Sequence, residues 1–496
     1  MRKMSLLEKD WEDIIPIDIG PMYEGERIRK NEFRVEFGGT GNSGYELVTA
    51  VEDSEEVEDE RVNIVGPDLK EIEEGSSMAL GVSIEVYIER NEELDPKNLE
   101  SVIERRHHEF SNYIHGLMHL NQRGDIWIRL SKDVFEKGLD SFEKIGKAIM
   151  KMYKTEQTFI EKMKITYYTT EEDVVDNLEK AKEIWKKRDQ RVRDLHEEDV
   201  EKFYGCVLCQ SFAPDHCCVI TPDRIALCGA ITYLDAQAAA TVDPEGPYFE
   251  IDKGELVNEN DPAREFTGAN EAVKEKTDGA NERFRLHTIF DYVHTSCGCF
   301  EGAYFYIPEV DGIGFIHRDF EGETPLDISF SKMASTIGGG QQSYGFLGGA
   351  RAYMRSPKFL QGDGGWMRIV WMPQEIKEEF KDVIPDENYD KIVTEKETRD
   401  VKELKKLLEE KNHPVVTRWI DVTDDLIKRV IKYIKEHGGK VEPEEASKDL
   451  GINEVQFRNV IDEMKDRGIL GGEPGGYLDD LNYRWGRGEI CEWPWS

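Results

Sequence analysis

The sequence predicts a multidomain protein of the α/β and α+β classes, with mixed sheets, helices and a small winged-helix-like module at the C-terminal end. Three observations predict this. The 496 residues exceed what one compact core usually holds. Strand-like and helical patterns alternate over residues 1–200, and the composition changes near residue 200 and again near residue 373. We therefore expect an α+β domain at 1–200, a second domain at 201–400 and the winged-helix-like module at 424–496.

Within these domains, local patterns predict particular strands and helices. Residues 82–90 and 124–130 alternate apolar and polar side chains, as half-buried strands do. Residues 177–195 predict a long charged helix. Residues 201–372 are richer in Gly, Cys and aromatic residues and poorer in charge, as expected where the backbone approaches a buried group closely. Residues 374–412 return to a charged helical composition and are expected to form a connector.

The C-terminal segment has the outline of a winged helix. Residues 424–437 place apolar side chains at helical spacing, residues 443–452 predict a second short helix, and Asn453 is the expected N-cap of a third. The sequence GGEPGGYL at 471–478 could then form a small hairpin. Because residues 424–470 hold nine basic and eleven acidic side chains, we expect a protein-docking or structural module in preference to a DNA-binding one.

The overall charge excludes some functions. The chain has 102 acidic and 65 basic residues, which leave a net charge of −37. A surface that negative repels phosphate backbones, so we expect no general nucleic-acid binding. The sequence has no run of about 18 apolar residues that would predict a membrane span. The charged N-terminal segment also lacks the apolar stretch of a secretory signal. We therefore expect a cytoplasmic protein that does not act on membranes.

Three weaker motifs are better explained by structure than by chemistry. The pattern from Gly39 to Gly44 matches G-x-G-x-x-G, but the following residues continue like a strand, so we expect a glycine turn. His115 and His119 could share one face of a helix, but no glutamate of an H-E-x-x-H motif accompanies them, so packing or surface roles are favoured. The densest basic patch is expected to be a solvated helix face, with the docking of a phosphate-bearing ligand as the alternative. It comprises Lys186, Lys187, Arg188, Arg191 and Arg193.

The cysteines carry the strongest signal. Seven of the eight lie between Cys206 and Cys299, and because disulfides are rare in a reducing cytosol, this cluster points to metal. The first set combines a C-x-x-C pair with two further thiols: Cys206, Cys209, Cys218 and Cys228. Four thiolates suit either a tetrahedral zinc or a cubane iron–sulfur cluster. The second half of the set is C-x9-C in apolar, proline-punctuated surroundings, which is unlike a zinc ribbon and favours iron–sulfur.

The second set is the tripeptide Cys297-Gly298-Cys299. Its two sulfurs are too closely spaced to join one tetrahedral zinc comfortably. Two thiolates and the deprotonated amide nitrogens of Gly298 and Cys299 can instead form a planar N2S2 chelate, which favours Ni(II) or Cu(II). Glycine removes the side chain that would crowd this plane, and both sulfurs could bridge to a second metal. The alternative is a pair of buried or surface thiols, but the four cysteines nearby favour the metal.

Several segments resemble acetyl-CoA synthase, and most closely the β subunit of the archaeal acetyl-CoA decarbonylase/synthase complex. The likeness runs from about residue 18 to about residue 416, and its most specific segments are residues 203–230, 295–302, 358–373 and 411–416. The acetogen-type enzyme has an additional N-terminal domain that contacts carbon monoxide dehydrogenase. This chain begins too late to contain that domain, so the resemblance implies a stand-alone subunit of a larger complex.

The resemblance implies a nickel–iron–sulfur site, the A-cluster. Cys206, Cys209, Cys218 and Cys228 match the ligands of a 4Fe–4S cubane, and Cys209 matches the ligand that also bridges to a proximal nickel. The family commonly has an apolar residue where this chain has Cys217, so Cys217 is expected to be a small buried filler.

The resemblance also implies two nickel ions. Cys297 and Cys299 match the thiolates that hold a distal nickel together with the amide nitrogens of Gly298 and Cys299, and both thiolates match bridges to the proximal nickel. Phe212 matches an aromatic side chain that stands over the open position of that proximal nickel.

The activity implied by the resemblance is that of a CO-methylating acetyl-CoA synthase. It would assemble or cleave acetyl-CoA from a corrinoid-bound methyl group, carbon monoxide and coenzyme A. The implied partners are carbon monoxide dehydrogenase and a corrinoid iron–sulfur protein. Residues 1–200 are candidates to face coenzyme A or these partners, and residues 201–400 to carry the cluster. The alternatives are a non-catalytic iron–sulfur or zinc scaffold and an electron-transfer subunit, neither of which needs an N2S2 chelate beside a cubane.

Overall fold

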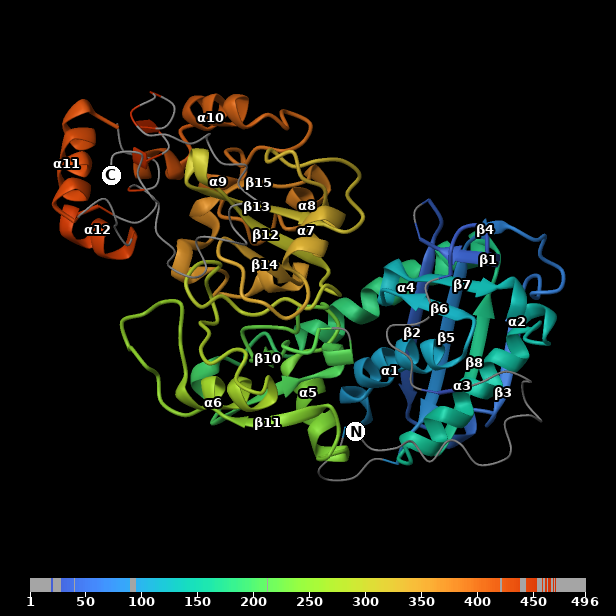
Figure 1. Cartoon of the computed structure of the whole chain (residues 1–496). Helices are drawn as coiled ribbons and strands as arrows, with labels where there is room; N and C mark the ends of the chain where they lie inside the picture. Colours follow the sequence, from blue (N-terminus) through green and yellow to red (C-terminus); the bar gives the residue numbers. More distant parts are fainter. Residues whose placement is uncertain are drawn as a thin grey trace. The chain divides into compact units, whose positions relative to one another are not determined.

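The structure is a computed structural model of the chain (Figure 1). It describes residues 19–20, 28–39, 41–89, 95–211, 213–419, 422–437 and 443–452, with isolated positions between 457 and 469. The chain forms two compact units. Unit 1 comprises Met1–Phe212 and Val219–Asp252, and unit 2 comprises Ala213–Cys218 and Lys253–Ser496.

Mixed sheets with helices make up both units, so the predicted α/β and α+β class is confirmed. Unit 1 contains two four-stranded sheets, with the orders β4-β1-β7-β6 and β2-β5-β8-β3. β1 pairs parallel with β4 and antiparallel with β7, and β5 pairs parallel with β2 and antiparallel with β8. The strands are β1 (Phe33–Gly38), β2 (Gly44–Val51), β3 (Arg61–Val65), β4 (Ser76–Met78), β5 (Leu80–Tyr87), β6 (Leu117–Leu120), β7 (Trp127–Ser131) and β8 (Lys162–Tyr168).

A smaller three-stranded sheet, with the order β10-β9-β11, carries the first cysteines. Its strands are β9 (Lys202–Cys206), β10 (Cys218–Ile220) and β11 (Tyr248–Asp252). The helices up to this point are α1 (Glu100–Tyr113), α2 (Lys132–Glu136), α3 (Phe142–Glu156), α4 (Glu171–Gln190) and α5 (Tyr233–Val242).

The predicted strands and the long helix are confirmed, with shifted ends. In β5, Val82, Ile84 and Val86 are buried while the residues between them are half-buried, as the alternation predicts. Helix α4 begins earlier than predicted because the Thr170 side chain accepts a hydrogen bond from the Asp173 amide and caps the helix. It ends earlier because the chain after Gln190 closes into a turn, in which the Arg193 amide donates to the Gln190 carbonyl.

Unit 2 is built around a four-stranded sheet with the order β14-β12-β13-β15. Its strands are β12 (Gly302–Ile307), β13 (Gly312–His317), β14 (Phe346–Gly349) and β15 (Ile369–Trp371). The first two are buried along their whole length. Charged short helices follow, as predicted for residues 374–412. The helices of unit 2 are α6 (Thr267–Lys276), α7 (Phe330–Ile337), α8 (Gln374–Glu379), α9 (Asp386–Tyr389), α10 (Val401–Glu410), α11 (Asp424–Glu436) and α12 (Pro443–Leu450).

Two of the three helices predicted in the C-terminal module are confirmed as α11 and α12. At the predicted third helix, the described positions 457, 460–461 and 463–464 are helical. Their apolar side chains pack against α11, in a cluster that includes Val430, Phe457 and Met464. The predicted hairpin at 471–478 lies outside the described residues.

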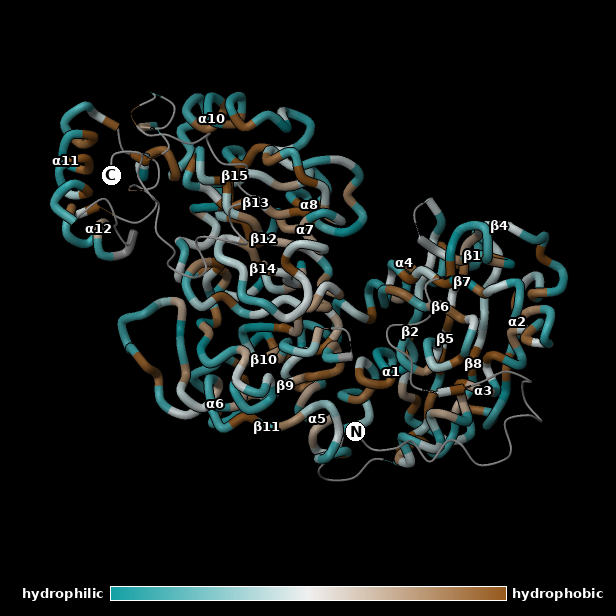
Figure 2. Tube along the Cα trace, in the orientation of Figure 1, coloured by the Kyte–Doolittle hydropathy of each residue, from teal (hydrophilic) through white to brown (hydrophobic). Residues whose placement is uncertain are grey.

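The distribution of hydropathy follows the strands. Figure 2 shows the apolar stretches in the strands of each unit and the polar ones along the outer helices. In unit 1 a single large apolar cluster lies among both four-stranded sheets and helices α1 and α3. Among the described residues, no helix combines the length and the apolar character that a membrane span requires.

Candidate metal centre

Two of the predicted cubane ligands lie at the end of strand β9 in unit 1. Cys206 is its last residue and pairs with Tyr248 of β11. The Val207 amide then donates a hydrogen bond of 3.1 Å to the Pro247 carbonyl and turns the chain into the 3-10 helix Leu208–Ser211, which carries Cys209. Both thiols are half-buried. The C-x-x-C spacing thus corresponds to a strand end followed by one tight turn.

Cys228 lies in a turn between residues 226 and 231, also in unit 1. The Gly229 amide donates to the Ala226 carbonyl over 2.9 Å, and Gly229 has a φ of +77°, which favours glycine. Two side chains from the β6–β7 connection fix the turn from outside. Gln122 Nε2 donates to the Cys228 carbonyl over 2.8 Å, and Arg123 Nη2 donates to the Ala230 carbonyl over 3.1 Å.

Tyr248 pairs with Cys206 across the sheet and is buried. Burial, and to a smaller extent Cys206 and Cys228, raises the pKa of the Tyr248 phenol well above its usual value. Its hydroxyl has no hydrogen-bond partner among the described residues, although it is buried.

In unit 2, the segment that carries Cys217 and Cys218 is fixed against the loop that carries Cys297 and Cys299. His216 Nδ1 lies 2.9 Å from Thr295 Oγ1, in a hydrogen bond between buried side chains. Asn281 Nδ2 donates to the carbonyl of Asp215 over 2.8 Å and to that of Gly340 over 3.2 Å. The structure thus brings the predicted third cubane ligand and the predicted N2S2 chelate into one packed region.

Three successive glycines line the backbone of the Cys297-Gly298-Cys299 loop. The Gly339 and Gly340 amides donate to the carbonyls of Cys297 and Ser296, over 3.4 Å and 2.9 Å. A Cβ at Gly338 would stand 3.0 Å from Gly298 Cα, so only glycine permits this approach. Gly298 itself has a φ of +102°.

The structure describes two of the three remaining predicted residues, Cys217 and Cys218 but not Phe212. Burial raises the pKa of Cys217 to about 12, so its thiol stays protonated, as expected of a small buried filler. Cys218 beside it is also buried. Phe212, the predicted aromatic side chain over the proximal nickel, lies outside the described residues. Of the six predicted thiolate ligands, unit 1 contains Cys206, Cys209 and Cys228, and unit 2 contains Cys218, Cys297 and Cys299.

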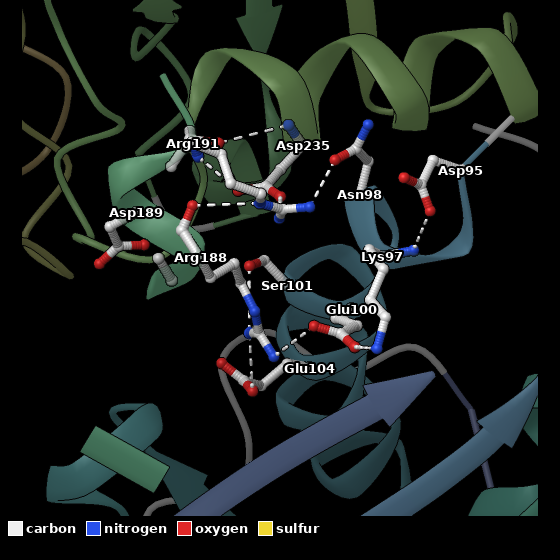
Figure 3. Close-up of polar contacts among 12 residues, drawn as sticks. Asp95, Lys97, Asn98, Glu100, Ser101, Glu104, Arg188, Asp189, Arg191 and Asp235 are labelled. Carbon is white, nitrogen blue, oxygen red and sulfur yellow. Dashed lines mark hydrogen bonds and ion pairs between the residues drawn. The ribbon is translucent and has the colours of Figure 1, made fainter. Parts of the chain in front are cut away.

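Two expectations about charged side chains are wrong. Arg188 is buried between the carboxylates of Glu100 and Glu104, at 3.1 Å and 3.2 Å (Figure 3). Arg191 Nη1 donates to Asn98 Oδ1 over 2.5 Å, and its Nη2 lies 3.4 Å from Asp235 Oδ1. These two guanidinium groups hold α4 and the turn after it in place and do not form a solvated face. The other members of the basic patch, Lys186, Lys187 and Arg193, are exposed.

The predicted helix face shared by His115 and His119 does not exist either. Helix α1 ends at Tyr113, His115 lies in a turn, and His119 lies in strand β6. By contrast, the predicted glycine turn between Gly39 and Gly44 is confirmed, since strands β1 and β2 flank it.

Sequence reasoning missed the residues that hold the cysteine loops. Gln122 and Arg123 act on a turn more than a hundred positions away, so no local pattern marks them. The run Gly338-Gly339-Gly340 was visible in the sequence and is a signal for close backbone approach.

Comparison with known proteins gives the family. Residues 15–174 match the family described as CO dehydrogenase/acetyl-CoA synthase complex beta subunit, and residues 185–419 match the family that describes the C-terminal part of the ACS/CODH beta subunit. The two matches define the class of protein as the beta subunit of such a complex.

Individual relatives agree. Acetyl-CoA decarbonylase/synthase complex subunit beta 2 of Methanosarcina mazei is 53% identical over 407 residues, which cover 82% of this chain and 85% of that protein. Subunit beta 2 of Methanocaldococcus jannaschii is 52% identical over 406 residues, which cover 82% and 84%. A solved C-terminal domain of an acetyl-coenzyme A synthase alpha subunit is 39% identical, covers 25% of this chain and 98% of that chain, and has a TM-score of 0.23. The chain belongs to the family of acetyl-CoA decarbonylase/synthase complex beta subunits.

Proposed function

We propose that the protein is the CO-methylating acetyl-CoA synthase subunit of such a complex and assembles or cleaves acetyl-CoA at a nickel–nickel–4Fe–4S centre. Cys206, Cys209, Cys218 and Cys228 would hold the cubane, and Cys297, Gly298 and Cys299 would hold the distal nickel. Cys209, Cys297 and Cys299 would also hold the proximal nickel, and Phe212 would shield it.

The observation that carries the proposal is the backbone of the Cys297-Gly298-Cys299 loop. A planar N2S2 chelate needs the amide nitrogens of Gly298 and Cys299 as ligands. The Gly298 amide donates no hydrogen bond to any described residue, and its φ of +102° is a backbone conformation that favours glycine. A turn that only positions two structural thiols does not require a backbone amide without a hydrogen-bond acceptor at this position. The donor set and the local backbone therefore fit the nickel that the proposal requires.

When bound, the centre supplies a thiolate-ligated metal at which a methyl group, carbon monoxide and a thiol are joined or separated. The chain's own residues position and shield it. Gln122 and Arg123 hold the Cys228 turn, and His216 and Asn281 hold the Cys218 segment against the second loop. Soft thiolates favour a low-valent metal, and no side-chain acid or base is assigned to the chemistry.

The names of the relatives place them in a multi-subunit complex. We propose that this chain acts with a carbon monoxide dehydrogenase and a corrinoid iron–sulfur protein, which would deliver carbon monoxide and the methyl group. The chain would thereby serve the Wood–Ljungdahl pathway or methanogenesis in an archaeon. Residues 1–200 would face coenzyme A or these partners, residues 201–400 would carry the cluster, and residues 424–496 would dock another protein or serve structure alone. Partners would meet local surface patches, because the net charge of −37 gives no general attraction to acidic proteins.

The test is metal content and exchange activity in five chains. We would measure iron and nickel per chain and the exchange of carbon monoxide with the carbonyl of acetyl-CoA. The five chains are wild type, Cys217→Ser, Cys218→Ser, Cys297→Ser and Gly298→Pro. We expect about four iron and two nickel in wild type. Cys217→Ser is the matched control for Cys218→Ser, since it changes a neighbouring buried thiol and should keep both metals and the exchange.

Each remaining variant removes one defined donor. Cys218→Ser should lose the cubane iron, because serine is a harder and poorer ligand. Cys297→Ser should keep the iron and lose nickel. Gly298→Pro replaces an amide N–H with a tertiary nitrogen that cannot be deprotonated and should abolish nickel binding. Full nickel content and exchange in Gly298→Pro would refute the chelate. Zinc alone in wild type would indicate a scaffold, and iron alone would indicate an electron-transfer subunit.

A further inference from the structure

A second group of potential metal ligands lies in unit 1, apart from the cysteines. Glu46 comes from strand β2, His107 from helix α1 and His119 from strand β6. Their exposed fractions are 1%, 2% and 0%. Glu46 Oε2 lies 2.8 Å from His107 Nδ1 and 2.9 Å from His119 Nε2. One ligand atom from each residue lies within 4.8 Å of the others.

Hydrogen bonds among Glu46, His107 and His119 do not satisfy all of their polar atoms. Among the described residues, Glu46 Oε1 and His107 Nε2 have no hydrogen-bond partner, although both atoms are buried. Each such atom has lost its hydration without gaining a partner, which is unfavourable. A buried polar group that remains unpaired in a packed interior calls for an explanation, such as an ion or a water molecule.

The polar contacts of the buried Glu46 carboxyl group are the imidazole rings of His107 and His119. Buried carboxylates in proteins are usually paired with a cation or coordinate a metal.

We propose that Glu46, His107 and His119 bind one divalent transition-metal ion, of the class that zinc represents. Two imidazole nitrogens and a carboxylate are a preferred donor set for such ions. Glu46 Oε1 would be a fourth donor, which explains why it has no other partner. The three ligands come from elements that the core of unit 1 already holds in place, so the ion would meet a largely formed site.

The surroundings of the two rings support this assignment. With His119 bound through Nε2, its Nδ1–H can donate to His108 Nδ1, which lies 2.9 Å away. Asn112 fixes the backbone of His119 on both sides, accepting from its amide and donating to its carbonyl, each over 2.8 Å. Ligating histidines are usually oriented through their second nitrogen in this way.

A small cavity of ≈ 20 Å³ lies beside the group and is lined by apolar side chains together with His107, Ser111 and Tyr167. The Tyr167 hydroxyl is buried and has no hydrogen-bond partner among the described residues. The site is closed to substrates, so the ion would be structural and would join α1 to β2 and β6.

The test uses the full-length chain in three forms: wild type, Glu46→Gln and Tyr167→Phe. Each is stripped with a chelator, exposed to excess zinc and freed of unbound zinc by gel filtration. Zinc per chain, zinc X-ray absorption and the thermal unfolding midpoint are then measured. Tyr167→Phe is the matched control, because it removes a polar atom from the same cavity without touching a proposed ligand.

We expect wild type and Tyr167→Phe to bind one zinc with only nitrogen and oxygen ligands, and to unfold at a higher temperature with zinc. Glu46→Gln should lose this zinc and the stabilisation. Zinc at the cysteines is distinguished by its sulfur ligands, and Cys297→Ser should not affect the zinc at Glu46, so this result is independent of the proposed catalytic centre. Only sulfur-bound zinc in wild type would overturn the proposal, even if Glu46→Gln fails to fold. An unchanged nitrogen- and oxygen-bound zinc in Glu46→Gln would overturn it as well.

Discussion

The packing of the glycine run against the cysteine loops predicts different effects for alanine at Gly340 and at Gly339. Both residues have a positive φ, +90° and +105°, so an alanine is strained at either position. They differ in their surroundings. A Cβ at Gly340 would lie 2.6 Å from the Asp215 carbonyl carbon and the His216 nitrogen, whereas a Cβ at Gly339 would meet nothing within 4 Å.

The magnitude follows from this difference. Backbone strain costs about 1–3 kcal/mol at each site and largely cancels between the two variants. The contact at Gly340 is with backbone atoms, which cannot rotate away, and forcing an extra methyl group into a packed site costs about 1–3 kcal/mol. We therefore expect Gly340→Ala to be about 1–3 kcal/mol less stable than Gly339→Ala in this region. This corresponds to roughly a 5- to 150-fold loss of hydrogen-exchange protection.

The assay is amide hydrogen exchange of the full chain, measured by mass spectrometry on peptides covering residues 213–218 and 294–300. Protection there should fall further in Gly340→Ala than in Gly339→Ala, while peptides from α1 and β5 in unit 1 serve as the internal control. Nickel content should fall in parallel if the two loops hold one metal centre. Equal loss of protection in both variants would refute the reasoning, because strain alone would then explain the glycines.

Three further predictions concern buried charges and the Cys228 turn. Arg188→Met should lower the free energy of unfolding of unit 1 by about 3–5 kcal/mol, because it removes the nearest cation from two buried carboxylates. Lys186→Met on the same helix removes an exposed charge and should change it by about 0.5 kcal/mol or less. Similar losses for both variants in denaturant titrations would contradict this. Burial raises the pKa of Asp363 from 3.8 to about 6, so the folded state is more stable when this carboxyl group is protonated. This contribution of about 3 kcal/mol is complete below pH 3.8 and is lost as the pH rises through 6. Asp363→Asn should therefore flatten this part of the profile of unfolding free energy against pH. Gln122→Ala removes the donor to the Cys228 carbonyl and should lower the free energy of unfolding by about 1 kcal/mol. It should also speed the loss of iron to a chelator, and an unchanged rate of iron loss would contradict the prediction.

Local patterns in the sequence were sufficient where burial repeats along one element. The alternation at 82–90 gave β5, and the apolar stripe at 424–437 gave α11, because each face is set by a fixed period. The ends were less predictable. The N-cap of α4 lies at Thr170, outside the charged segment that indicated the helix. The cysteine sets are also predicted from local spacing, since a short segment limits which sulfurs can meet one metal, and they stay a prediction.

Contacts between distant segments could not be predicted in this way. The basic patch on α4 was assigned to solvent because its own segment shows no reason for burial, but Glu100 and Glu104 of α1 surround Arg188. The cluster of Glu46, His107 and His119 joins three elements up to 73 positions apart, so it exists only through the sheet order and the position of α1. A single sequence indicates neither the burial of Arg188 nor the cluster of Glu46, His107 and His119, because both depend on which helices and strands become neighbours.

The cysteine loops are held by different physical means in the two units, and this determines how much change each tolerates. In unit 1, side-chain donors of Gln122 and Arg123 bond carbonyls of the Cys228 turn. Loss of such a hydrogen bond lowers the free energy of unfolding by about 1 kcal/mol. Another side-chain donor of similar length can replace it. In unit 2, Gly338 and Gly340 bring backbone against backbone, and any side chain there meets atoms that cannot move aside. The geometry of the Cys297-Gly298-Cys299 loop therefore depends on the absence of side chains around it. A chelate that uses backbone amides as ligands needs this kind of support, because its ligand atoms move only when the backbone moves.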